Sequence, residues 1–148
     1  MGNRAVIGFE QDKKRDKKSV GIYLHWNGGR DSVEGFLKVA KDYGVRGYDS
    51  SYCIARLTQI ICNYFGGTLS VGVDTLDKLD CDNYDNGLYW VDKDFNIVGR
   101  EYFEDCEEQN EYPIEEVIQD VNLKGMRIDF LMPFFFGLKL FLFDLIVY

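Results

Sequence analysis

The chain has 148 residues, which is enough for one domain with its own hydrophobic core. Hydrophobic residues make up 46% of it and aromatic residues 16%, a composition that excludes a mainly disordered protein. The net charge is −8, and it is concentrated in residues 51–120, where 16 acidic and four basic groups give −12. Direct binding to nucleic acid is therefore not expected, because such binding needs clustered positive charge.

The acidic middle of the chain favours a basic protein as partner, including a protein that itself holds nucleic acid. A solvated acidic surface that only keeps the protein soluble explains the same charge equally simply. Both interpretations stay open at the level of the sequence.

Two apolar segments near the N-terminus predict a pair of strands. They are Ala5–Phe9 and Val20–Trp26, and the charged stretch 11–18 between them is typical of a hairpin loop. Gly28-Gly29 then turns the chain toward a helical pattern.

Two helices are expected after this turn. Asp31 and Glu34 have the spacing of a capping box, which predicts that the first helix begins at Asp31, and Gly44 ends its pattern. The second helix begins in the polar segment 48–51 and ends at Gly66. The apolar positions of the two helices recur at helical spacing and are Val33, Phe36, Leu37, Ala40, Ile54, Leu57, Ile60, Ile61 and Tyr64.

Three further strands and a short helix are predicted in the second half. The strands are Leu69–Val73, Leu88–Val91 and Ile97–Phe103, of which the last two form a hairpin, and the helix is Pro113–Val121. The expected fold is a single α+β domain. It has a mainly antiparallel sheet of about five strands, with two helices packed on one face and a short third helix.

Residues 122–148 form a hydrophobic C-terminal tail beyond the α+β domain of residues 1–121. The stretch Phe130–Tyr148 is close to the length of about 20 apolar residues that a membrane span needs. Lys139 and Asp144 argue against a span, since each central charge costs roughly 2.5–3.5 kcal/mol on insertion. A helix or strand packed on the domain is favoured over membrane contact and over a poorly folded extension.

The strand-to-helix corner, residues 23–32 (YLHWNGGRDS), is one candidate site. Its candidate ligand-binding residues are His25, Trp26, Asn27, Arg30 and Asp31. N–H groups at a helix start and a guanidinium both suit an anion, and His25 suits a general base. The alternative is a structural corner with Trp26 buried, His25 satisfied and Arg30 paired with Asp82 or Asp85.

The acidic loop, residues 74–87, is the other candidate site, together with the acidic segment 101–116. Its candidate partner-binding residues, which include two aromatic anchors just after the loop, are Asp80, Asp82, Tyr84, Asp85, Tyr89 and Trp90. The loop lacks the glycine and glutamate spacing of an EF-hand, so no metal is expected. Asx side chains that cap their own backbone are the structural alternative.

Signals for catalysis are weak throughout the chain. The dinucleotide, Walker, G-x-S-x-G and H-E-x-x-H patterns are all missing from the sequence. The four cysteines form no CxxC pair, and Cys53 and Cys62 are predicted to be buried within the second helix. We therefore expect no catalytic residues and no cofactor. The cysteine pattern and an N-terminus without a signal-peptide core favour the cytoplasm.

Five segments form a combination that is more specific than any one of them. They are MGNRAVI (1–7), YLHWNGGRDSVEGFL (23–37), NYFGGTLSVG (63–72), LDCDNYDNGLYWV (79–91) and IVGREYF (97–103). This combination resembles a family of small, mostly uncharacterised proteins of phages, prophages and other mobile elements of bacteria. The resemblance supplies no catalytic residues and does not cover residues 122–148. It implies a genomic neighbourhood rich in counter-defence proteins, including anti-CRISPR inhibitors.

The expected function is a counter-defence inhibitor from a phage or mobile element. It would act in the cytoplasm of the bacterial host by binding a defence complex, in the first place a CRISPR-Cas effector, through its acidic surface. CRISPR effectors hold guide and target in positively charged channels, which an acidic protein can occupy or flank. The alternative is a small cytoplasmic enzyme or an anionic-ligand-binding protein that uses the strand-to-helix corner.

Overall fold

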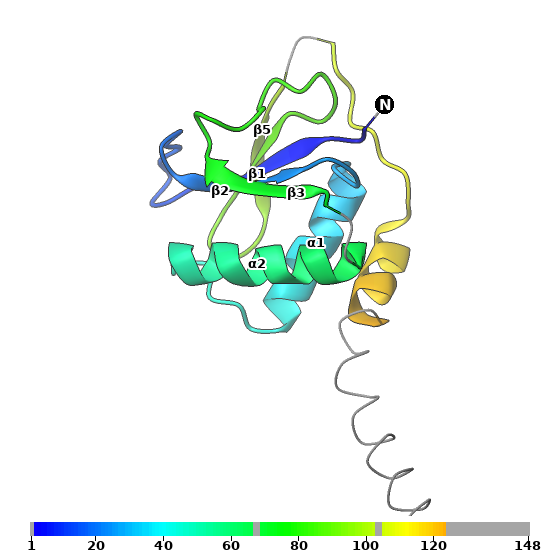
Figure 1. Ribbon diagram of the computed structural model, residues 1–148. Helices are drawn as coiled ribbons and strands as arrows, with labels where there is room; N and C mark the ends of the chain where they lie inside the picture. The colour runs from blue at the N-terminus through cyan, green and yellow to red at the C-terminus, as the bar shows by residue number, and fades with distance from the viewer. Residues whose placement is uncertain (1, 67–68, 103–104, 124–148) are drawn as a thin grey trace, which may run out of the picture.

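The computed structural model describes residues 2–66, 69–102 and 105–123 of this chain. They form one domain with a single five-stranded sheet and two helices on one of its faces (Figure 1). The elements in chain order are β1 (Ala5–Phe9), β2 (Val20–Leu24), α1 (Arg30–Asp42), α2 (Ser50–Phe65), β3 (Val71–Thr75), β4 (Leu88–Val91) and β5 (Ile97–Glu101). Residues 114–123 form a third, short helix.

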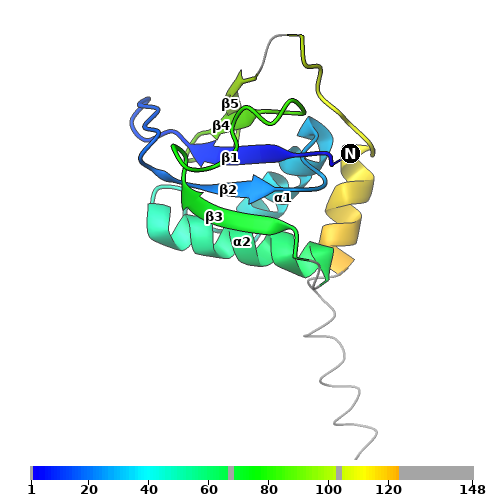
Figure 2. The ribbon, with the colours of Figure 1, turned by 45° about the horizontal axis from the view of Figure 1, so that its top comes forward.

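The strand order is β3-β2-β1-β4-β5, and Figure 2 shows the strands in this sequence. All neighbours are antiparallel except the central pair of β1 and β4, which is parallel. Every residue of β1 and β4 is buried, as expected for central strands that are covered on both faces. The predicted α+β fold with a mainly antiparallel sheet is therefore confirmed.

The helix-covered face of the sheet holds the larger part of the core. Ile7 and Ile22 from the strands meet Phe36 of α1 and Leu57 of α2, and each is fully buried. Burial of a side chain of this size contributes about 1.5–3 kcal/mol relative to leaving it in water. The apolar stripes of the two helices thus fix their position beneath the sheet.

The opposite face of the sheet is covered by the acidic loop instead of by helices. Leu76 enters from the loop and joins Val6, Leu88 and Trp90 in a second apolar cluster. Gly21 makes room for it, because a Cβ at that position would overlap the Leu76 side chain. The loop therefore has an apolar anchor in the fold although its sequence is dominated by aspartate.

The start of α1 differs from the prediction. Gly29 is the N-cap, with φ −61° and ψ 157°, and it has no side-chain cap. The capping box was wrong because Asp31 lies inside the first turn, where it binds other backbone groups, and Glu34 pairs with Arg30. The helix α2 does have a side-chain cap, since Asp49 accepts a hydrogen bond from the N–H of Tyr52.

Other local predictions were also wrong. The strand β2 ends at Leu24, so His25 and Trp26 lie beyond the sheet and both are exposed. Cys53 is buried as predicted, but Cys62 is exposed because it lies on the outer side of α2.

The predicted third helix is confirmed in residues 114–123. It runs across the predicted domain boundary at residue 121, and residues 124–148 of the predicted tail lie outside the described residues. No helix within the described ranges has the length and apolarity needed to cross a membrane.

Candidate functional site

The acidic loop is held from within by hydrogen bonds to its own backbone. The Asn83 side chain is buried, and its Oδ1 accepts hydrogen bonds from the N–H groups of Asp85 and Gly87 at 3.1 and 3.0 Å. Its Nδ2 donates to the carbonyl of Asp80 at 3.0 Å. One inward side chain therefore fixes the last turn of the loop before β4.

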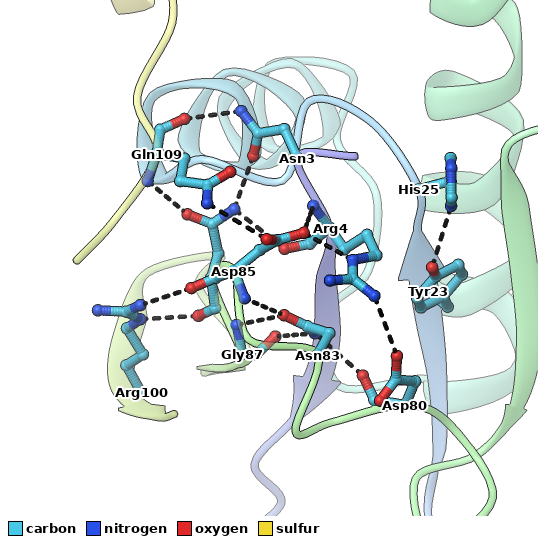
Figure 3. A network of polar contacts seen from close by, with 11 residues as sticks. Asn3, Arg4, Tyr23, His25, Asp80, Asn83, Asp85, Gly87, Arg100 and Gln109 are labelled. Atoms are coloured by element: carbon cyan, nitrogen blue, oxygen red, sulfur yellow. Dashed lines mark hydrogen bonds and ion pairs between the residues drawn. The ribbon is translucent and has the colours of Figure 1, made fainter. Parts of the chain in front are cut away.

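Asp85 ties the loop to the residue that precedes β1 (Figure 3). Its carboxylate accepts hydrogen bonds from Nε of Arg4 at 2.6 Å and from the backbone N–H of Arg4 at 3.1 Å. Gln109 donates a third bond at 3.2 Å. Burial alone would raise the pKa of Asp85, but the hydrogen bonds and charge of Arg4 hold that pKa below its ordinary value. The carboxylate is thus ionised and committed to the fold.

Asn86 joins three segments that are far apart in the sequence. Its fully buried side chain donates to Oδ1 of Asn3 at 2.6 Å and accepts from the backbone N–H of Gln109 at 2.7 Å. Asn3 in turn donates to the carbonyl of Gln109 at 2.7 Å. Arg100 of β5 donates to the carbonyl of Asn86 at 2.7 Å. This polar network is closed on itself, so its role is structural.

The outer side of the same loop presents carboxylates to solvent. Asp77, Asp80 and Asp82 are exposed, and Tyr84 is 63% exposed. Asp80 makes a long ion pair with Arg4 at 3.8 Å. Across the part of the chain that the structure describes, no cation lies within ion-pair distance of Asp77 or Asp82. The loop therefore has neutral and paired groups inside and, at Asp77 and Asp82, exposed carboxylates with no ion-pair partner among the described residues.

Half of the predicted partner-binding set does not lie on this surface. Tyr89 and Trp90 are fully buried in β4, and Asp85 is 5% exposed. The prediction of Tyr89 and Trp90 as contact residues was wrong because Leu88–Val91 is a central strand covered on both faces, and that of Asp85 was wrong because its carboxylate turns inward to Arg4. Asp80, Asp82 and Tyr84 remain at the surface, and the structure adds Asp77 to them. The apolar run LYWV was the sequence signal for a buried strand.

The strand-to-helix corner separates its candidate residues. His25 and Trp26 project from the sheet as an exposed aromatic pair, with ring centroids 5.0 Å apart at 86°. Nδ1 of His25 lies 3.2 Å from the hydroxyl of Tyr23. Asn27 turns the other way, toward the hydroxyls of Ser32 and Tyr64 at 3.4 and 3.3 Å.

Arg30 and Asp31 are both engaged by one segment of the protein itself, residues 108–112. Nε of Arg30 donates to the Glu108 carboxylate at 2.9 and 3.1 Å. Asp31 accepts hydrogen bonds from the backbone N–H groups of Glu111 and Tyr112 at 2.7 and 2.6 Å. The predicted pairing of Arg30 with Asp82 or Asp85 was wrong. The anion at the start of α1 is the protein's own Glu108, so the corner acts as a structural joint.

The geometry for nucleophilic or metal chemistry is weak. Within residues 2–66, 69–102 and 105–123, no group of three His, Cys, Asp or Glu side chains is arranged to hold a metal ion. Burial raises the pKa of the Cys53 thiol to about 12, which keeps it protonated and unreactive. Two surface cavities, of about 520 and 380 Å³, are lined by neither the corner nor the acidic loop.

Comparisons with known proteins do not assign a function to this chain. No protein-family model, curated protein or solved structure matches it. A function is therefore inferred from the surface described above and from the charge of the chain.

Proposed function

We propose that this protein is a non-enzymatic inhibitor that binds a basic surface of another protein through the outer side of its acidic loop. The observation that carries the proposal is the division of that loop into two sides. Leu76, Asn83 and Asp85 fix it from within, while Asp77 and Asp82 are exposed and have no ion-pair partner in the described part of the chain.

A fixed acidic surface has an advantage over a flexible acidic segment. The conformational entropy of the loop is already lost on folding, so less free energy is lost when a partner binds. Exposed carboxylates also raise the association rate with a positively charged partner, and this effect falls as salt is added.

The partner we propose is a bacterial defence complex, in the first place a CRISPR-Cas effector, met in the cytoplasm of the host. Such effectors carry positively charged channels for guide and target, which complement the acidic loop in sign. The choice of a defence complex follows from the sequence resemblance alone, to which no family model, curated protein or solved structure adds.

The test is affinity capture of the tagged full-length chain from bacteria that express a panel of defence complexes. We expect one effector to be recovered at low salt and lost at high salt. The Asp77→Asn/Asp82→Asn double variant should not recover it, whereas Asp94→Asn, which changes an exposed carboxylate in the β4–β5 turn, should. Recovery of the bait alone from the whole panel, or recovery that neither salt nor the double variant changes, would overturn the proposal.

A further inference from the structure

His25 of the corner lies beside the sheet face that the acidic loop covers, since its ring meets the hydroxyl of Tyr23 on that face. Val6 is the register partner of Tyr23, and both belong to the face that the loop covers. Just beyond the ends of the two strands, the side chains of Arg4 and His25 lie close together, since a Cβ at Gly2 would be 3.1 Å from Cγ of Arg4 and 3.5 Å from Nε2 of His25. The two regions that the sequence separates by about fifty residues therefore meet across β1 and β2.

The contacts confirm that this surface is continuous. Arg4 lies 3.8 Å from the Asp80 carboxylate, and it lies beside Tyr23 (Figure 3). The Tyr23 hydroxyl reaches His25 at 3.2 Å, and the His25 ring meets Trp26 edge to face. The contacts thus lead from the Asp80 carboxylate over Arg4 and the half-buried Tyr23 ring to the exposed rings of His25 and Trp26.

From this arrangement we infer that the surface selects an arginine-bearing segment of the partner, with guanidinium groups on Trp26 and His25 and on the carboxylates of Asp80 and Asp82. The inference rests on the proposed function and names the chemistry that its partner presents. Guanidinium is planar, stacks on aromatic faces and binds carboxylates with two parallel hydrogen bonds. A lysine ammonium is more strongly hydrated and lacks this planar geometry.

The protein places two of its own arginines beside an aromatic ring and a carboxylate. Arg4 lies between two carboxylates beside the Tyr23 ring. Just before the start of α2, Arg46 lies 4.3 Å from the centroid of the Tyr52 ring and pairs with Asp49 at 3.4 Å. Trp26 is 44% exposed, and its ring remains open to a guanidinium from outside.

The test uses the full chain and two labelled probes of equal charge, a nona-arginine and a nona-lysine peptide. We expect the arginine peptide to bind at least roughly fivefold more tightly than the lysine peptide at the same salt concentration. Trp26→Ala should remove most of that preference, whereas Trp26→Phe should keep it because a ring is retained. Tyr48→Ala, which removes an exposed ring elsewhere, should bind both peptides like the wild type.

Three results separate this inference from the proposed function. Equal affinity for the two peptides, or an arginine preference that survives Trp26→Ala, overturns the arginine selection. If the arginine preference is absent but Asp77→Asn/Asp82→Asn still binds both peptides more weakly than the wild type, the proposed acidic binding surface is retained and only the arginine selection is rejected. If the double variant binds both peptides with the same affinity as Asp94→Asn, the acidic loop is rejected as the binding surface too. Thermal unfolding of each variant shows that the fold is retained.

Discussion

The strand-to-helix corner and the acidic loop are both rich in polar side chains beside a glycine. They differ in how many of their charged groups are paired within the protein. In the corner, the charges of Arg30 and Asp31 meet residues 108–112 and the protein satisfies its own groups. In the acidic loop, the buried carboxylate of Asp85 binds Arg4, whereas the exposed carboxylates of Asp77 and Asp82 have no ion-pair partner among the described residues.

This difference shows that a concentration of charged residues does not by itself locate a site. What distinguishes the two regions is whether each charge is already neutralised by a neighbour. Exposed charges without a neighbour contribute little to stability, so they are the ones available to a partner. The predictions below test this division between inner and outer charge.

The largest effect is expected when the inner carboxylate is removed. Asp85→Ala should lower the free energy of unfolding by about 3 kcal/mol, because it leaves Arg4 and Gln109 without their acceptor in a largely buried place. Urea unfolding measures this loss. Asp82→Ala, three positions away and exposed, should change the same quantity by less than about 0.5 kcal/mol. Similar losses of unfolding free energy in the two variants would contradict the division of the loop into an inner and an outer side.

The stability that Asp85 contributes should disappear at acid pH. Its pKa is lowered in the folded protein, so the contribution is complete above the ordinary aspartate pKa of about 3.9 and is lost as the pH falls through the lower, folded value. Urea midpoints of the wild type and of Asp85→Asn should therefore converge below about pH 4. If the difference between the two urea midpoints stays constant from neutral to acid pH, Asp85 stabilises the fold by packing and not by its charge.

A smaller effect is expected in the corner. Arg30→Gln should cost about 1 kcal/mol, since the ion pairs with Glu108 and Glu34 are partly exposed. Hydrogen exchange at the amides of Glu111 and Tyr112 should become faster as residues 108–112 loosen. Unchanged exchange at these amides would show that Arg30 does not hold residues 108–112 against the start of α1.

The smallest effect on stability is expected at the outer carboxylates. Asp77→Asn/Asp82→Asn should leave the unfolding midpoint within experimental error of the wild type, because neither carboxylate has an ion-pair partner in the described part of the chain. A clear rise in stability would also be informative, since it would mean that these acids repel one another in the free protein.

Much of the fold was readable from the sequence because its signals are local. The four apolar residues of β4, the hairpin from β4 to β5 and the apolar stripes of α1 and α2 were all predicted. The parallel pairing of β1 with β4 was not, because nothing in either strand specifies a neighbour some eighty residues away.

The candidate site was predicted only in part, for the same reason. The aspartates of the acidic loop were recognised, but which of them turn inward depends on Arg4 and Gln109, far away in the chain. The partner of Arg30 was missed because Glu108 lies in a segment without regular structure. A closer reading of Asn83, Asp85 and Asn86 as side chains that bind backbone could have indicated the inner side of the loop.

The most direct test of the central claim is the affinity of the purified captured complex, measured for the wild type, Asp77→Asn/Asp82→Asn and Asp94→Asn across a range of salt concentrations. The account predicts that the double variant binds roughly tenfold more weakly at low salt and loses part of its salt dependence, while Asp94→Asn behaves like the wild type. Equal affinities and equal salt dependence in all three proteins would contradict the claim that the outer side of the acidic loop is the binding surface.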